Sequence, residues 1–191
     1  MSSAVDIANQ ALAMLGSKPI ISFNDDTTES AAVNTVYDPV FRNVLRMHEW
    51  GCTTKVATLA LKADPPADTY WHYLYAQPTD TVRIIDVFTN GIDYYNRREW
   101  QIEGKDIVSR IPNALARYTA KVREPDLDSH VEALLVARLA AELAYPLTAS
   151  TTREQTLYAM FEQKLREART TDNLEGTHTG FRIDGLQIVR F

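Results

Sequence analysis

The sequence predicts an α+β fold: helices from both ends of the chain form one lobe, and an antiparallel β-lobe is inserted between them. Apolar residues recur at helical spacing near both ends. Between them, β-branched residues in short alternations are separated by turn-forming segments, of which Asn90-Gly91 is typical of a hairpin. These patterns place the helical lobe at 1–52 and 125–170, the β-lobe at 53–124 and an extended C-terminal arm at 171–191.

The first 52 residues predict two helices. Ser2-Ser3 can cap the first, which Gly16 and Pro19 stop. Thr27-Thr28-Glu29 caps the second, with the Thr28 side chain placed to accept backbone N–H groups. Pro39 lies inside the second helix, and proline removes a hydrogen bond and crowds the preceding turn. We therefore expect a kink there, or a helix that restarts at Pro39.

The middle of the chain predicts six strands, separated by segments rich in Pro, Gly, Asp and Asn. They are Thr53–Leu61, Tyr70–Tyr75, Val82–Phe88, Trp100–Ile102, Asp106–Val108 and Leu115–Val122.

Two more helices are predicted in the last third. The third follows Pro125, is capped by Asp126 or Asp128, and ends at Pro146. The fourth begins after Ser150-Thr151 and carries a Glu162–Arg166 pair one turn apart on its charged face. Their apolar stripes are Leu127, Val131, Leu134, Leu135, Leu139 and Leu143, and then Leu157, Tyr158, Phe161 and Leu165.

From Thr170 the helical stripe is lost, and short β-compatible segments follow. Apolar and arginine side chains near the end suit an arm that adds a strand to another chain, and a frayed terminus is the alternative. The candidate docking residues of this arm are Phe181, Arg182, Ile183, Leu186, Ile188, Val189, Arg190 and Phe191.

Composition narrows the class of protein. The 191 residues are 45% hydrophobic and 24% charged, which is typical of an ordinary soluble globular chain. No run approaches the roughly 20 apolar residues that span a bilayer, and MSSAVDIANQ lacks the features of a secretion signal. A single cysteine, Cys52, excludes an internal disulfide. The net charge of −5 disfavours specific nucleic-acid binding, which needs a basic surface.

The sequence gives only weak evidence for any chemical site, so we expect no catalytic, metal or cofactor site. His48 and Cys52 are one turn apart, but no second ligand pair lies nearby. Glu132 and Glu142 are better explained by a solvated helix face than by a glycosidase pair. No nucleophile, zinc-protease or phosphate-loop motif occurs. The aromatic residues Tyr70, Trp71, Tyr73 and Tyr75 are better explained by a core or an interface than by base stacking.

Several motifs occur in an order that resembles one family. The Pro-containing helix and its break have the sequence YDPVFRNVLRMHEW, which includes Tyr37, Asp38, Pro39 and Trp50. A strand ending in Leu-Ala-Leu follows. The segment before this helix reads ANQALAMLGSKPIISFNDDTTESA. The segment after the strand reads YWHYLYAQPTDTVRIIDV, and a pair of helices covers 128–176. Together these resemble the head-to-tail adaptors of short-tailed bacteriophages, also called tail tubular protein A. The sequence departs from the family pattern at two places. Glu49 stands where proline is expected, and Cys52-Thr53 stands where a more aromatic pair is expected.

The resemblance implies a structural virion protein of the tail, assembled in the host cytoplasm and without enzymatic activity. It implies a ring of twelve copies, with the helical lobe and arm against the portal protein. The β-lobe would face the tail nozzle (tail tubular protein B) and the tail fibres. Genomic DNA would pass through the lumen without specific binding, and no membrane is involved. Two other classes stay open: a virion-associated cell-wall or capsule glycan hydrolase, and a cytoplasmic regulator that binds nucleic acid.

Overall fold

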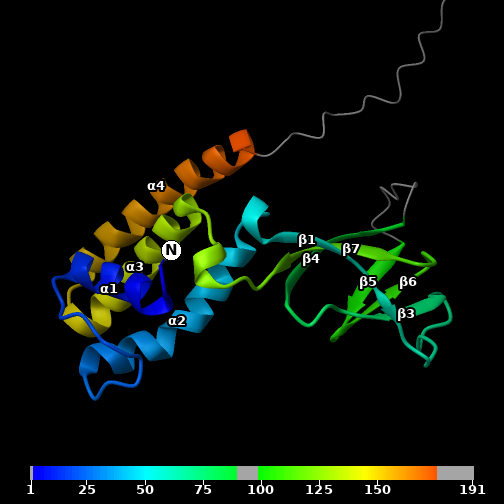
Figure 1. The fold of residues 1–191 in the computed structure, drawn as a ribbon, viewed down its shortest axis with the longest axis horizontal. Coiled ribbons are helices and arrows are strands. Elements are labelled where there is room, and N and C mark those ends of the chain that lie inside the picture. The colour runs from blue at the N-terminus through cyan, green and yellow to red at the C-terminus, as the bar shows by residue number, and fades with distance from the viewer. Residues whose placement is uncertain (1, 90–98, 176–191) are drawn as a thin grey trace, which may run out of the picture.

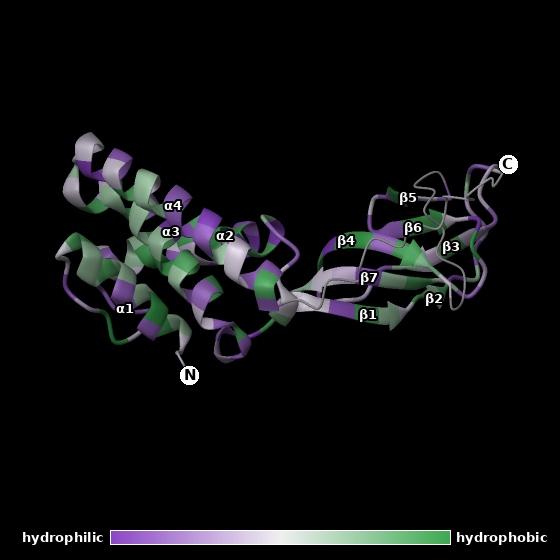
Figure 2. Ribbon diagram, turned by 90° about the horizontal axis from the view of Figure 1, so that it is seen from above, coloured by the Kyte–Doolittle hydropathy of each residue, from purple (hydrophilic) through white to green (hydrophobic). Residues whose placement is uncertain are grey.

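The computed structural model describes residues 2–89 and 99–175 and shows two lobes, one of helices and one of strands (Figure 1). Figure 2, seen from above, shows the four helices at one end and both sheets at the other. Each lobe has its own buried apolar cluster. The α+β class is therefore confirmed: α1–α2 and α3–α4 pack together, and an antiparallel β region is inserted between them.

The two N-terminal helices begin at capping residues. α1 (Ala4–Leu15) starts with a reciprocal pair between Ser3 and Asp6 and ends at Gly16, whose φ of +67° suits a residue without a side chain. α2 (Thr28–Arg46) is capped by Thr27, which accepts from the Ser30 N–H at 3.1 Å. The prediction that Thr28 is the cap is wrong by one residue. α2 is continuous through Pro39, so the helix does not restart there.

α3 (Ser129–Thr148) is the centre of the helical lobe and packs against the other three helices. Its buried alanines let those neighbours approach closely, and its leucines fill the space between them. The helix runs past Pro146 to Thr148, contrary to prediction. A proline disturbs the turn that precedes it and leaves the following residues free to keep helical dihedrals. Ala149 then ends it in the left-handed conformation, its N–H donating to the Tyr145 carbonyl.

α4 (Thr151–Glu175) is longer than predicted. The sequence indicated extended chain from Thr170, whereas residues 170–175 continue the helix. Leu157, Phe161 and Ala168 are buried against the lobe, with Tyr158 and Leu165 partly buried beside them. The expected Glu162–Arg166 ion pair is not among those formed by the described residues.

The β region contains two antiparallel sheets. One has the order β1-β7-β4 and the other the order β2-β3-β6-β5. The strands are β1 (Thr54–Thr58), β2 (Ala60–Leu61), β3 (Tyr73–Ala76), β4 (Thr81–Phe88), β5 (Trp100–Glu103), β6 (Asp106–Ser109) and β7 (Leu115–Ala120).

One predicted strand is divided between the two sheets. Thr53–Leu61 splits at Leu59, whose side chain is buried and whose N–H donates to the Ala114 carbonyl. β1 therefore pairs with β7, and β2 crosses to pair with β3. β3 begins at Tyr73 rather than Tyr70. The predicted turn at Asn90-Gly91 lies outside the described residues.

The described helices include none with the length and apolar character needed to cross a membrane.

Candidate functional site at the junction of the two lobes

The two lobes are joined by two short helical turns, η1 (Gly51–Thr53) between α2 and β1, and η2 (Glu124–Asp126) between β7 and α3. The junction also contains the end of α2 and the last turns of α4, which come close to η1 (Figure 1). The residues singled out in the Tyr37–Trp50 motif all lie on the α2 side of this junction.

Trp50 fixes the path of the chain as it leaves α2. Its side chain is fully buried, and its Nε1–H donates to the Val44 carbonyl at 2.9 Å. Its own carbonyl accepts from the backbone N–H groups of Thr53 and Thr54 at 3.0 Å each. The predicted break after the tryptophan is therefore a tight turn anchored in the helical core, since all these bonds hold one short segment.

A buried carboxylate from α4 closes the same turn. Asp172 accepts from the Gly51 N–H at 2.9 Å through Oδ1, and its Oδ2 lies 3.1 Å from His48 Nε2. The His48 ring packs edge-on to Trp50, with centroids 4.8 Å apart. Arg169 of α4 adds a bond to the Met47 carbonyl at 2.8 Å. The C-terminal end of α4 is thus bonded directly to the junction.

Asp38 connects α2 to the strand side of the junction. Its carboxylate lies 2.6 Å from Lys121 Nζ, just after β7, and 2.8 Å from Arg42 Nε on the next turn of α2. The hydrogen bond from Lys121 lowers the pKa of Asp38 below its usual value, and the charge of Arg42 adds to this. Tyr37, one residue earlier, donates to Glu124 at 3.3 Å, and burial together with this carboxylate raises its pKa.

We expect Asp38→Asn to lower the free energy of unfolding at pH 7 by about 1 kcal/mol or less, because the ion pairs are half exposed. The folded pKa is lowered, so the contribution is complete above the unfolded value of about 3.9 and is lost as the pH falls through the folded value. Urea titrations of both chains at pH 7 and below pH ~3 should show a gap that closes in acid. Asp64→Asn, at an exposed site without an ion pair among the described residues, is the control. A gap that widens in acid would contradict the assignment.

A pocket of about 370 Å³ lies between α2 and the start of β4. Its charged lining residues are Arg42, Arg46, Lys121 and Asp80, and Thr79, Thr81 and Val82 complete it. Each cation already has a partner: Arg46 donates to the Val82 carbonyl, and Asp38 holds the other two. Asp80 also binds Lys55 at 2.9 Å. The contacts among the residues that line the pocket therefore help to hold the two lobes together.

The carboxylates weighed as a glycosidase pair do not form one. Glu132 and Glu142 lie ten residues apart on α3, or about 15 Å along the axis, whereas such pairs flank a bond at roughly 5–9 Å. Glu132 accepts from Gln10 at 3.3 Å, and Glu142 binds Arg138 and the Tyr158 hydroxyl. Burial raises the pKa of the Cys52 thiol to about 11, so that thiol stays protonated and weakly nucleophilic near neutral pH.

The aromatic residues of the β-lobe divide between core and surface. Trp71 and Tyr75 are buried, and the Tyr75 hydroxyl donates to the Ile111 carbonyl at 2.8 Å. Tyr73 stacks on Tyr75 with centroids 6.0 Å apart. Tyr70 is 52% exposed and has Arg110 over its ring. Most of the cluster therefore has the packing role expected from the sequence.

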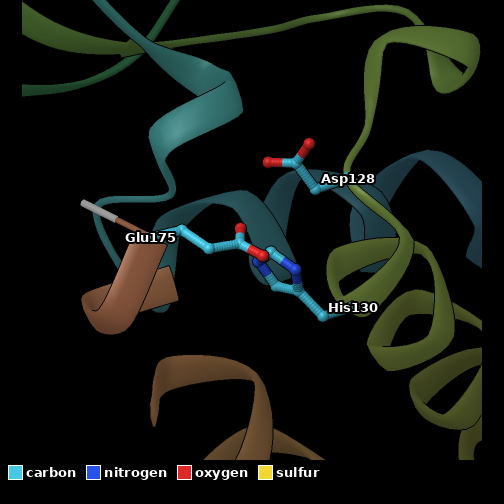
Figure 3. Close-up of side chains that lie close together, drawn as sticks. All are labelled: Asp128, His130 and Glu175. Carbon is cyan, nitrogen blue, oxygen red and sulfur yellow. The ribbon is translucent and has the colours of Figure 1, made fainter. Parts of the chain in front are cut away.

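The structure brings together one group that the sequence pattern does not suggest. Asp128, His130 and Glu175 lie side by side where the start of α3 meets the end of α4 (Figure 3). His130 was not among the residues singled out from the sequence, and Glu175 fell in the segment expected to be extended. The docking residues predicted in the arm, from Phe181 to Phe191, lie outside the described residues.

Comparison with models of known protein families finds no match to this chain, and comparison with curated proteins finds none either.

Proposed function

We propose that this protein is a structural head-to-tail adaptor of a short-tailed bacteriophage. In this proposal twelve copies form a ring that joins the portal to the tail nozzle and fibres, and genomic DNA passes through the lumen. The observation that carries the proposal is the order of parts: a helical lobe made from both ends of the chain encloses an inserted β-lobe. The motifs that resemble the adaptor family follow the same order along the sequence.

The contacts at the junction support a role in which the protein transmits mechanical force between two partners. Asp38 on α2 pairs with Lys121 beside β7 and so joins the two lobes directly. Trp50 and Asp172 fix the turn that leads from α2 into β1. A protein that connects one ring to another needs its two binding ends held in a fixed relation, and this set of contacts provides it.

The surface of the β-lobe supports assembly with other chains. Val56 on β1, Leu61 on β2 and Ile102 on β5 are all exposed apolar side chains. All three strands lie at the edges of their sheets. Edge strands with exposed apolar residues are suited to pairing with another chain, and neighbouring copies or nozzle subunits are the partners in this proposal.

The direct test mixes the purified chain with portal rings of the same phage and measures the complex by native mass spectrometry. We expect a ring of adaptor subunits bound to each portal ring. A parallel assay on peptidoglycan and capsular polysaccharide addresses the hydrolase alternative. Release of sugar ends by a chain that does not bind portal would replace the adaptor proposal with that alternative.

We expect no measurable affinity for duplex DNA at physiological salt. The chain carries a formal charge of −5, so twelve copies carry 12 × −5 = −60. Acidic walls repel phosphate, which lets DNA slide through without being held. Fluorescence anisotropy with a labelled duplex at increasing salt measures this. Sub-micromolar, salt-sensitive binding by the pure chain would contradict it.

A further inference from the structure

Three side chains from two helices are arranged as a set of metal ligands. Asp128 precedes α3, His130 lies in its first turn, and Glu175 is the last residue of α4. One ligand atom from each lies within 4.8 Å of the others, and Figure 3 shows the side chains gathered at this point. Ligands about 2.1 Å from a tetrahedral zinc ion are about 3.4 Å apart. Glu175 is exposed at the end of α4, so rotation of its side chain can bring the ligand atoms closer together.

His130 supplies a second, independent observation. Its side chain is only 12% exposed, and its Nε2 is buried without a hydrogen-bond partner among the described residues. The neighbouring Asp172 Oδ1 is 3.7 Å away, which is too long for a hydrogen bond. A buried ring nitrogen without a partner costs free energy. A cation bound by Nε2 would remove that cost.

Asp172 places further negative charge beside this ring nitrogen, because its Oδ1 lies 3.7 Å from His130 Nε2. Asp172 is itself held by the Gly51 N–H and His48, so its position is fixed by the junction.

We propose that Asp128, His130 and Glu175 bind a divalent transition-metal ion of the Zn²⁺ class, with water completing the coordination. One nitrogen and two carboxylate ligands suit such an ion better than Mg²⁺ or Ca²⁺, which prefer oxygen ligands alone. The ion ties the last turn of α4 to the start of α3, beside the Trp50 turn. It therefore suppresses fraying of the last turn of α4. The site was not expected from the sequence, and it does not depend on the adaptor role.

The test is calorimetric titration of the untagged full-length chain with ZnCl2, and with MgCl2 in parallel. We expect one saturable Zn²⁺ site per chain and a melting temperature that rises with Zn²⁺. Glu175→Gln and His130→Ala should each weaken binding by ~10-fold or more and remove the rise in melting temperature. His72→Ala, an exposed histidine on the β-lobe, should change neither quantity.

Glu175→Gln keeps the variant series interpretable, because an exposed residue at a helix end can be changed without unfolding the chain. Its metal-free melting temperature should match that of the parent. Absence of saturable Zn²⁺ binding would overturn the proposal, and so would Mg²⁺ binding as tight as Zn²⁺ binding. It would also fail if Glu175→Gln and His130→Ala left the affinity unchanged.

Discussion

Replacing Trp50 with alanine is expected to lower the free energy of unfolding by about 3–5 kcal/mol, the usual cost of truncating a buried tryptophan. The ring is fully buried in the helical core, and its Nε1–H bonds to the Val44 carbonyl. It also packs against both His48 and His130. Truncation therefore opens a cavity at the point where α2, α3, α4 and the turn into β1 meet. Urea-induced unfolding followed by circular dichroism measures the loss.

Trp50→Phe is the matched control, because it keeps a buried aromatic ring and removes the Nε1–H donor with the smaller part of the indole. We expect a smaller loss, of about 1–3 kcal/mol. A loss below about 1 kcal/mol for the alanine variant would show that the junction does not depend on this side chain. It would also remove the structural reason for treating the Tyr37–Trp50 motif as the joint between the lobes.

Under the adaptor proposal, deleting Thr179–Phe191 is expected to leave a folded chain that fails to dock on portal. The core of the helical lobe that the structure describes runs from Ile7 to Ala168, so it does not need these residues. The deleted segment carries apolar and arginine side chains suited to strand addition on a partner. Twelvefold repetition of a weak arm contact would give high avidity, so its loss should abolish binding.

Circular dichroism and thermal melting should be nearly unchanged by the deletion, while co-sedimentation with portal rings should collapse. Two double variants of the full-length chain separate the charged from the aromatic contribution of the arm. One combines Arg182→Ala with Arg190→Ala, and the other combines Phe181→Ser with Phe191→Ser. If the truncated chain still saturates portal rings, the arm is not the docking element. The Tyr37–Trp50 segment would then be the better candidate.

The sequence predicted the fold class and nearly every element because its signals were local. The Ser3 cap, the Gly16 stop and the β-branched runs depend only on neighbouring residues. It could not predict the division of Thr53–Leu61 between two sheets. That division depends on Leu59 being buried beside Ala114, a contact more than 50 residues away.

The junction was only partly predictable. Trp50 and its break were evident from the Trp-Gly pair, but the carboxylate that closes the turn was not. The sequence did contain a signal for this carboxylate. One helical stripe runs through Phe161, Leu165, Ala168 and Asp172. Extending that periodicity past Thr170 therefore places Asp172 on the buried face of the helix. The grouping of Asp128 and His130 with Glu175 depends on how α3 and α4 pack, which sequence spacing does not contain.

Electron microscopy of the full-length chain mixed with portal rings of the same phage tests the adaptor proposal most directly. The expected result is a twelvefold ring on one face of the portal, with the helical lobe against it, the β-lobe pointing away and an open central channel. Portal rings that stay bare at saturating concentrations of the folded chain would contradict it.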